Sequence, residues 1–224
     1  MDGRLKGAEI HFDKVSVGAT ENTLMAASLA EGTTIIHNAA REPEVCDLAE
    51  CLASMGAVID GIGTSTITID GQDRLHAADH RVVVDRIEAG SFACAAAITH
   101  GEVELVGAKA GHMGSMVDHF IKAGVSVEDT TDGLLVSAKG GLFATDITTA
   151  PYPDFPTDMQ AQFMAMLALA EGTSVITETI FENRFMQVSE LIRMGANIDI
   201  SGNTATVTGA AALKGAEVMA TDLR

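Results

Sequence analysis

The stretch Glu171-Gly172-Thr173-Ser174 follows an Ala-rich apolar segment and opens a short run that is typical of a strand. The same arrangement occurs at Glu31-Gly32-Thr33-Thr34 and at His100-Gly101-Glu102-Val103. Gly101 therefore follows Gly32 by 69 residues, and Gly172 follows Gly101 by 71. This spacing indicates one supersecondary unit that is written three times along the chain.

A second glycine marker has the same period, because each copy also carries a glycine directly after its second predicted helix. Neighbouring members of this set are 68 and 71 residues apart: Gly56, Gly124 and Gly195. Two independent markers thus predict a repeat of about 70 residues. The opening Leu5-Lys6-Gly7-Ala8-Glu9-Ile10 recurs at residues 213–218. We therefore expect a fourth copy of which the sequence holds only the start, and hence a fragment of a longer protein.

Each copy has the pattern helix, strand, helix, strand, turn, strand. In the first copy, residues 19–30 predict a helix, 34–36 a strand, and 58–60 with 66–69 a hairpin around a glycine-containing turn. The second helix has one apolar face with i, i+3, i+7, i+10 spacing: Val45, Leu48, Leu52 and Met55. Units that cannot bury such helices alone would pack them together. The predicted fold class is therefore α/β (α+β), with helices inside and sheets outside.

Composition narrows the functional classes. The chain has 224 residues, of which 47% are hydrophobic and 20% charged, so we expect a folded chain of one large or two modest domains. A formal charge of −17 and a single tyrosine argue against nucleic acid as a partner. No apolar run reaches the roughly 18 residues that a membrane-spanning helix needs. We therefore expect a soluble, cytoplasmic protein with no membrane partner.

Neither the cysteines nor the histidines show the spacing of metal ligands. Cys46, Cys51 and Cys94 lie among apolar neighbours in predicted helices, which indicates buried reduced thiols. His112 and His119 are two turns apart on one predicted helix, about 10 Å by helix rise, which is too far to share a metal ion. The sequence therefore predicts no metal and no cofactor.

The loop before the first helix of the third copy is a candidate for chemistry. Residues 151–160 hold three of the four prolines of the chain, which predicts a rigid loop. Thr157 and Gln160 form a capping-box pattern that would place Asp158 at the first helical position. An acidic side chain there either complements the helix dipole or serves in acid–base chemistry, and the pattern alone leaves both open.

Two further segments have the residue types that bind anions. Asp13-Lys14-Val15-Ser16-Val17-Gly18-Ala19-Thr20 leads into a helix, and its lysine, hydroxyl and glycine suit an anion or a sugar at the helix N-terminus. An ordinary strand-to-helix turn is equally compatible with this segment. Arg184 and Arg41 occupy equivalent turns of the third and first copies. Either guanidinium can clamp a phosphate or carboxylate, whereas surface arginines are usually solvated.

Together these segments closely resemble the UDP-N-acetylglucosamine 1-carboxyvinyltransferase family of enolpyruvyl transferases, in the EPSP synthase superfamily. The most specific stretch is Phe155-Pro156-Thr157-Asp158-Met159-Gln160-Ala161-Gln162. The resemblance extends over essentially the whole chain and also rests on residues 13–20, 38–44, 178–186 and 219–224.

The resemblance implies a two-domain protein of six such units, an inside-out α/β barrel pair that closes on its substrate. Residues 1–83 would be the last unit of the nucleotide-sugar-side domain. Residues 84–224 would be two units and the first strand of a third in the other domain, with the crossover near Asp85-Arg86 as a hinge strand. The partner implied for this chain is the remainder of its own protein.

The resemblance also implies the reaction. The enolpyruvyl group of phosphoenolpyruvate would pass to the 3-hydroxyl of UDP-N-acetylglucosamine with release of phosphate, the first committed step of peptidoglycan synthesis. Asp158 would be the general base, and Arg184 and Arg224 would face the carboxylate and phosphate of phosphoenolpyruvate, with Asp222 in the same site. The residues implied to bind the nucleotide sugar are Lys14, Val15, Ser16, Val17, Gly18, Asp158, Ile180 and Phe181.

Two elements of that family have no counterpart in this sequence, namely its cysteine-bearing mobile loop and its N-terminal Lys-Asn pair. The chain alone is therefore expected to be inactive. Three alternatives stay open: the sister enzyme that acts on shikimate 3-phosphate, a non-catalytic remnant that binds the nucleotide sugar, and an acidic clamp that encircles DNA. Apolar inward helices count against the clamp, and residues 14–20 and 155–162 favour the nucleotide-sugar enzyme over its sister.

Overall fold

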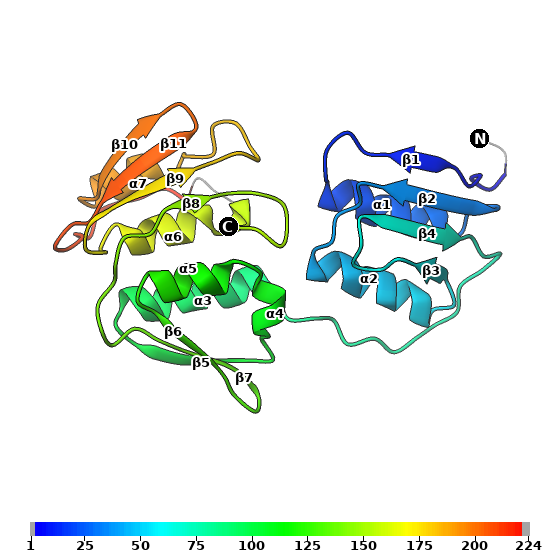
Figure 1. Ribbon diagram of the computed structural model, residues 1–224, viewed down its shortest axis with the longest axis horizontal. Coiled ribbons are helices and arrows are strands. Elements are labelled where there is room, and N and C mark those ends of the chain that lie inside the picture. The colour runs from blue at the N-terminus through cyan, green and yellow to red at the C-terminus, as the bar shows by residue number, and fades with distance from the viewer. Residues whose placement is uncertain (1–2, 221–224) are drawn as a thin grey trace. The chain divides into compact units, whose positions relative to one another are not determined.

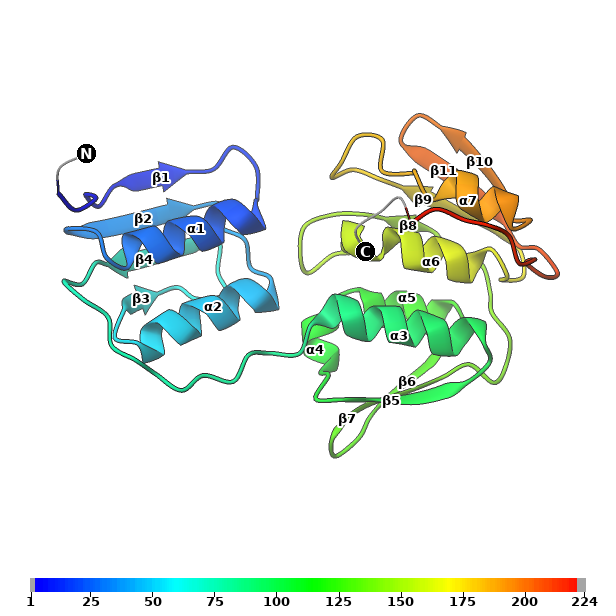
Figure 2. The ribbon, with the colours of Figure 1, turned by 180° about the vertical axis from the view of Figure 1, so that it is seen from behind.

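The computed structural model describes residues 3–220, and the chain divides into two compact units, Met1–Val83 and Val84–Arg224. Unit 1 is a four-stranded sheet with both helices on one face (Figures 1 and 2). Its strand order is β1-β2-β4-β3, with β1 parallel to β2 and the other neighbours antiparallel. The elements are β1 (Glu9–His11), α1 (Val17–Ala27), β2 (Thr33–His37), α2 (Pro43–Ser54), β3 (Val58–Asp60) and β4 (Thr66–Asp70).

The sheet of unit 1 buries alternate residues. Ile36 of β2 and Ile67 and Ile69 of β4 are at most 1% exposed, and they pack with Leu24 of α1 in one apolar cluster. The residues between them along each strand are more accessible, because side chains of a strand alternate between the two faces. One face of the sheet is therefore core, and the other is open to solvent.

Unit 2 contains two further copies of the same pattern. The first copy forms the sheet β5-β7-β6 and the second the sheet β8-β9-β11-β10. The first comprises α3 (Arg86–Ile98), β5 (Glu102–Val106), α4 (Ala110–Met113), α5 (Met116–Lys122), β6 (Ser126–Asp129) and β7 (Gly133–Ser137). The second comprises β8 (Ile147–Thr148), the 3-10 turn η1 (Thr157–Met159), α6 (Gln160–Leu167), β9 (Thr173–Thr177), α7 (Val188–Arg193), β10 (Asn197–Ser201) and β11 (Thr204–Thr208).

Helices lie between the two sheets of unit 2, as Figure 1 shows for α3 and α6. Helix α3 packs on β5 and β7, α6 packs on β9 and β11, and the two helices pack on each other. The prediction of helices inside and sheets outside is confirmed for this unit. Both copies share a single apolar cluster, so neither has a core that is separate from the other.

Aromatic rings form the centre of that shared core. Phe163 of α6 lies 4.5 Å from Phe120 of α5 and 4.8 Å from Phe155, measured between ring centroids. All three rings are at most 1% exposed, and burial of one such side chain contributes about 1.5–3 kcal/mol to folding. The loop that carries Phe155 is thereby fixed to the helices, and this loop leads directly into Thr157 and Asp158.

Two details of unit 2 differ from the sequence predictions. The second helix of the middle copy is split at Gly114, whose φ is 56°, so His112 and His119 lie on different helices, α4 and α5. A Cβ at Gly114 would lie 2.5 Å from the carbonyl oxygen of Pro153, so the proline loop packs where a continuous helix would run. No strand lies near Asp85 among the described residues, where a hinge strand was expected, and Asp85 is the N-cap of α3, its carboxylate accepting from the amide of Ile87 at 2.8 Å.

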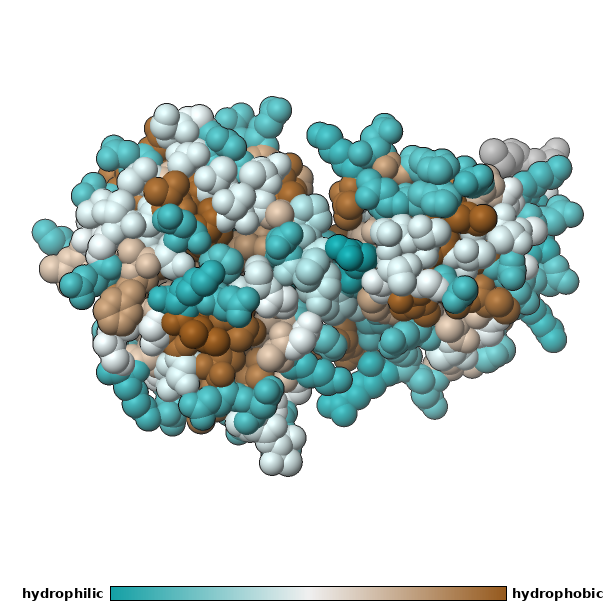
Figure 3. Space-filling view, in the orientation of Figure 1, coloured by the Kyte–Doolittle hydropathy of each residue, from teal (hydrophilic) through white to brown (hydrophobic). Residues whose placement is uncertain are grey.

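Apolar side chains also reach the surface, and Figure 3 shows brown patches among teal and white ones. The most exposed apolar residues include Val82, Val106 and Met219, which are 70–73% exposed. Apolar patches of this kind are typical of surfaces that contact other protein segments. Among the described residues, no helix has the length and hydropathy that crossing a membrane would require.

Glycines directly after the last strand of two copies permit a close backbone approach. A Cβ atom at Gly71 would lie 2.0 Å from the carbonyl oxygen of Ala30, and one at Gly209 would lie 1.7 Å from that of Ala170. Such distances are far below van der Waals contact. Glycine at these positions therefore lets the end of the sheet meet the end of the first helix.

We predict that Gly209→Ala lowers the free energy of unfolding by about 2 kcal/mol or more, because the added methyl group must displace backbone. Gly140→Ala is the matched control in the same unit, since a Cβ there meets nothing within 4 Å. Its effect should stay within about 0.5 kcal/mol. Urea unfolding followed by circular dichroism measures both, and equal midpoints for the two variants would contradict the packing argument.

The three thiols differ in burial, so the prediction that all are buried holds for Cys94 alone. Cys46 and Cys51 are partly accessible. Burial raises the pKa of the Cys94 thiol, and burial followed by the charge of Glu50 raises the pKa of Cys46. Because the thiolate is the reactive form, Cys94 is expected to be the least reactive of the three.

We predict that a thiol reagent labels Cys94 only after the protein is unfolded. Mass spectrometry of peptides from native and urea-treated samples would locate the label. The Cys94→Ala variant should show the same native labelling as the parent chain. Native labelling of Cys94 at the rate seen in urea would show that α3 opens far more readily than its packing indicates.

Candidate active site

The residues implied for substrate binding fall into two groups, one in each unit. Residues 14–18 lie at the N-terminal end of α1 in unit 1. In unit 2, Asp158 lies in the 3-10 turn η1, and the loop between β9 and α7 carries Ile180, Phe181 and Arg184. Asp222 and Arg224 lie outside the described residues.

The group in unit 1 surrounds a helix start. Ser16 is the N-cap of α1, and its hydroxyl oxygen accepts from the amide of Ala19 at 3.3 Å. Lys14 and Gly18 are exposed, and a Cβ at Gly18 would meet nothing within 4 Å, so the space above the first turn is open. The positive end of the helix dipole and the lysine together favour an anion here.

Carboxylates gather one turn further along α1. Burial, followed by the charges of Glu44 and Glu42, raises the pKa of Glu21. Glu42 is itself 6% exposed, and it accepts from the amide of Arg41 at 2.9 Å. Negative charge thus lies beside the start of α1, next to the positive end of the helix dipole and Lys14.

The group in unit 2 centres on an ion pair between Asp158 and Arg184. The Nη2 atom of Arg184 lies 2.8 Å from Oδ1 of Asp158, and its Nη1 donates to the hydroxyl of Thr157 at 2.9 Å. The guanidinium also lies over the ring of Phe181, 5.2 Å from the centroid. The side chains of Arg184 and Asp158 are 17% and 31% exposed, so the pair is partly shielded yet reachable from solvent.

The predicted capping box at Thr157 and Gln160 is wrong. The hydroxyl of Thr157 donates to Oε2 of Glu178 at 2.8 Å, while the amide group of Gln160 donates to the carbonyl of Arg184 at 3.0 Å. Both side chains therefore bind the neighbouring loop in place of the helix start. Asp158 lies in the 3-10 turn η1 just before α6, which directs its carboxylate toward Arg184.

Glu178 holds the two loops of this site together. Its carboxylate is 2% exposed and accepts four hydrogen bonds from described residues. Oε1 accepts from the hydroxyl of Thr149 at 2.8 Å and from the amides of Ile180 and Phe181 at 2.8 and 3.2 Å. Oε2 accepts from Thr157 at 2.8 Å. The role of Glu178 has no local sequence signature, because its hydroxyl partners are 21 and 29 residues away along the chain.

This arrangement keeps two apolar side chains at the surface. Ile180 and Phe181 are 39% and 56% exposed, although their backbone amides are fixed by the buried Glu178 carboxylate. A side chain on a fixed backbone can contact a ligand with little loss of conformational freedom. The loop therefore presents an apolar contact surface next to the ion pair.

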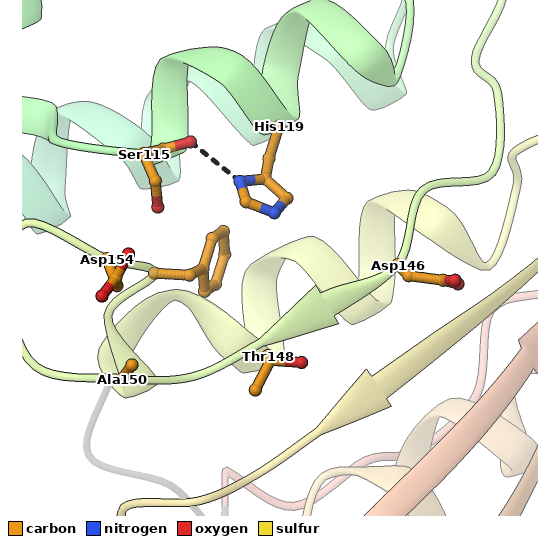
Figure 4. Close-up of a pocket in the computed structure, with 7 residues that line it drawn as sticks. Ser115, His119, Asp146, Thr148, Ala150 and Asp154 are labelled. Carbon is orange, nitrogen blue, oxygen red and sulfur yellow. Dashed lines mark hydrogen bonds between the residues drawn. The ribbon is translucent and has the colours of Figure 1, made fainter.

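A separate pocket of about 410 Å³ lies between α5 and β8 in unit 2, and Figure 4 shows its lining. His119 occupies one wall, where its Nδ1 lies 2.8 Å from the carbonyl oxygen of Ser115 and its ring packs edge-on against Phe155. The lining residues are Ser115, His119, Asp146, Thr148, Ala150, Asp154 and Phe155. None of the site residues that the resemblance implied is among them, so pocket size does not identify the candidate site.

Some α/β proteins are built from repeated units whose helices are enclosed between outer sheets. The fold and the two site loops described above place the chain in this class. A family model described as EPSP synthase (3-phosphoshikimate 1-carboxyvinyltransferase) matches residues 1–224. The chain belongs to this family.

Curated relatives are similar over the whole chain. It is 59% identical over 223 residues to a UDP-N-acetylglucosamine 1-carboxyvinyltransferase of Zymomonas mobilis, covering 100% of this chain and 52% of that protein. It is 60% identical over 223 residues to one of Dinoroseobacter shibae, covering 99% and 53%. The chain thus spans about half the length of the curated relatives that it matches.

A solved structure gives the same picture of the fold. The enolpyruvyl transferase NikO from Streptomyces tendae matches with a TM-score of 0.78 and 25% sequence identity. The match covers 86% of this chain and 46% of that protein. The predicted enolpyruvyl transferase fold is therefore confirmed.

We predict that Glu178→Gln loosens the loop that carries Ile180 and Phe181. Glutamine removes the negative charge and leaves one carbonyl oxygen as acceptor, so the buried hydrogen bonds to this side chain are weakened at a total cost of about 1–3 kcal/mol. Hydrogen exchange at the amides of Ile180 and Phe181 should then accelerate by about tenfold or more. Mass spectrometry of peptides from this loop, with and without the substitution, measures the change.

Glu182→Gln provides the matched control, because Glu182 is exposed and lies in the same loop. It should leave exchange at the loop unchanged. If both substitutions give the same exchange rates as the parent chain, Glu178 does not hold the loops as described.

Proposed function

We propose that the protein to which this chain contributes transfers the enolpyruvyl group of phosphoenolpyruvate to the 3-hydroxyl of UDP-N-acetylglucosamine, releasing phosphate. Support comes from the 57–60% identity, over nearly the whole chain, to curated proteins that carry this name. The reaction would take place in the cytoplasm and would begin peptidoglycan synthesis. The substrates of the whole protein would be the nucleotide sugar and phosphoenolpyruvate.

The ion pair between Asp158 and Arg184 is the observation that carries the proposal. In the reaction, the 3-hydroxyl oxygen bonds to C2 of phosphoenolpyruvate while the hydroxyl proton is removed and C3 gains a proton. The tetrahedral adduct then loses a proton from C3 and breaks its C2–O bond to phosphate. A carboxylate and a cation held 2.8 Å apart supply a proton acceptor and a counter-charge for the anionic substrate in one place.

The roles proposed for Asp158 and Arg184 are linked, because the substrate and Asp158 would bind the same guanidinium. The carboxylate and phosphate of phosphoenolpyruvate are anions, and they would compete with Asp158 for Arg184. Thr157 and the Phe181 ring would keep the guanidinium in position during this exchange, since both contact it independently of Asp158. The Oδ1 atom of Asp158 would then accept the hydrogen of the sugar hydroxyl.

The remaining site residues belong to the same proposal. Lys14, Val15, Ser16, Val17 and Gly18 would bind the uridine diphosphate portion, for which the helix start of α1 offers positive potential and open space. Ile180 and Phe181 would contact the nucleotide sugar through their exposed side chains. Asp222 and Arg224 would complete the phosphoenolpyruvate side of the site. Residues 1–83 and 84–224 would contribute to the two different domains of the enzyme.

We predict that Asp158→Asn lowers turnover by about 10²- to 10⁴-fold, because an amide cannot accept the hydroxyl proton. The test uses a chimera in which this chain replaces the matching segment of the Zymomonas mobilis relative, with phosphate release as the readout. Substrate binding measured by calorimetry should persist, which separates loss of chemistry from loss of fold. Near-normal turnover of the variant would rule out Asp158 as the base.

The matched control is Asp154→Asn, an exposed carboxylate four residues upstream in the same loop. It should retain the turnover of the parent chimera. Shikimate 3-phosphate is tested as an alternative acceptor in place of UDP-N-acetylglucosamine. Turnover with shikimate 3-phosphate but not with UDP-N-acetylglucosamine would favour the sister enzyme. An inactive chimera that still binds the nucleotide sugar would favour the non-catalytic remnant.

A further inference from the structure

Three potential metal ligands lie together on β1 and β2 of unit 1, and none of them is among the candidate site residues. Glu9 and His11 are two residues apart on β1, so their side chains point to the same face. His37 on β2 is directly opposite His11 in the parallel register. The residues that alternate with them are less accessible, since Ile10 on β1 is partly buried and Ile36 on β2 is buried, so the three side chains are on the side that the helices do not cover.

The ligand atoms of these side chains converge. The Oε1 atom of Glu9 lies 2.9 Å from Nε2 of His37 and 3.5 Å from Nε2 of His11. All three atoms lie within 4.8 Å of one another. With Zn–N and Zn–O bonds of about 2.0–2.1 Å, two ligand atoms of a tetrahedral site are roughly 3.4 Å apart. The observed separations straddle that value, so small rotations of exposed side chains suffice to form a site.

The two imidazole rings lie side by side on adjacent strands. They stack with centroids 4.3 Å apart and an angle of 11° between their planes, with both Nε2 atoms directed at the same carboxylate. Because an imidazole nitrogen binds a metal ion in the plane of its ring, the two rings must tilt toward each other to bind one ion, and their exposure allows this rotation. Two imidazoles and one carboxylate suit Zn²⁺ and its neighbours in the first transition series better than Mg²⁺ or Ca²⁺, which prefer oxygen ligands alone.

Access and charge favour a cation at this position. The side chains of Glu9 and His11 are 62% and 67% exposed, and that of His37 is 32% exposed, so an ion reaches the ligands from solvent. The chain as a whole carries a formal charge of −17, which raises the local concentration of cations. Water would complete the coordination on the open side.

We propose that Glu9, His11 and His37 form a binding site for a divalent transition-metal ion, with Zn²⁺ as the best match. The ion would join β1 to β2. Strand β1 is short and lies at the edge of the sheet, where it pairs with β2 along three residues. Metal binding to the folded state would therefore stabilise this edge, and the effect would be reversed by a chelator.

Isothermal titration of the chelator-treated chain with zinc chloride tests the proposal. We expect one equivalent of Zn²⁺ to bind, and each of His11→Asn, His37→Asn and Glu9→Gln to weaken binding by about tenfold or more. His100→Asn is the matched control, because His100 is exposed in unit 2 and its φ of 53° is one that asparagine tolerates. Circular dichroism verifies that every variant keeps its fold.

A second readout separates this site from the thiols. The Co²⁺ complex should show visible bands of a nitrogen and oxygen site, without the thiolate charge-transfer band that Cys46 or Cys51 would produce. Zn²⁺ should raise the melting temperature of the parent chain and leave that of His11→Asn unchanged. The proposal is overturned by an absence of saturable binding, by equal affinity in parent and variants, or by a thiolate band.

Discussion

Burial of apolar helix faces between sheets is the constraint on which the rest of unit 2 depends. Neither of its two copies encloses a core alone, because α3 and α6 cover their own sheets and still need each other. A Cβ at Gly90 of α3 would lie 2.8 Å from the side-chain end of Met159 in η1, so the buried Met159 side chain packs directly on α3. The site loops start from this junction, since Phe155 and Met159 are buried on either side of Asp158.

Polar contacts then define the site on top of that core. The two site loops are joined by hydrogen bonds to one side chain. The buried carboxylate of Glu178 accepts from hydroxyl and amide donors of both loops. A buried, fully bonded carboxylate is costly to disturb, because loss of one partner leaves charge without compensation. The position of the Asp158 and Arg184 pair is thus set by packing first and by this network second.

Local patterns account for what the sequence predicted well. Glycine markers and helical spacing act within one copy, and they placed the repeat, the helices and the hairpins. The split at Gly114 depends on Pro153, and the bond of Thr157 to Glu178 replaced the predicted cap. Neither has a local signature. The cluster of Glu9, His11 and His37 was equally invisible, because His37 comes within reach only through the parallel register of two strands.

Because both loops bind the same carboxylate, a movement of one loop affects the other. A ligand that displaces the side chain of Ile180 also displaces its backbone amide, which donates to Glu178. Glu178 in turn accepts from the hydroxyl of Thr157, the residue before Asp158. Displacing one loop alone would break a buried hydrogen bond. Contact at the apolar surface and the orientation of the acidic group are therefore energetically coupled, and the free energy of that coupling acts equally in both directions.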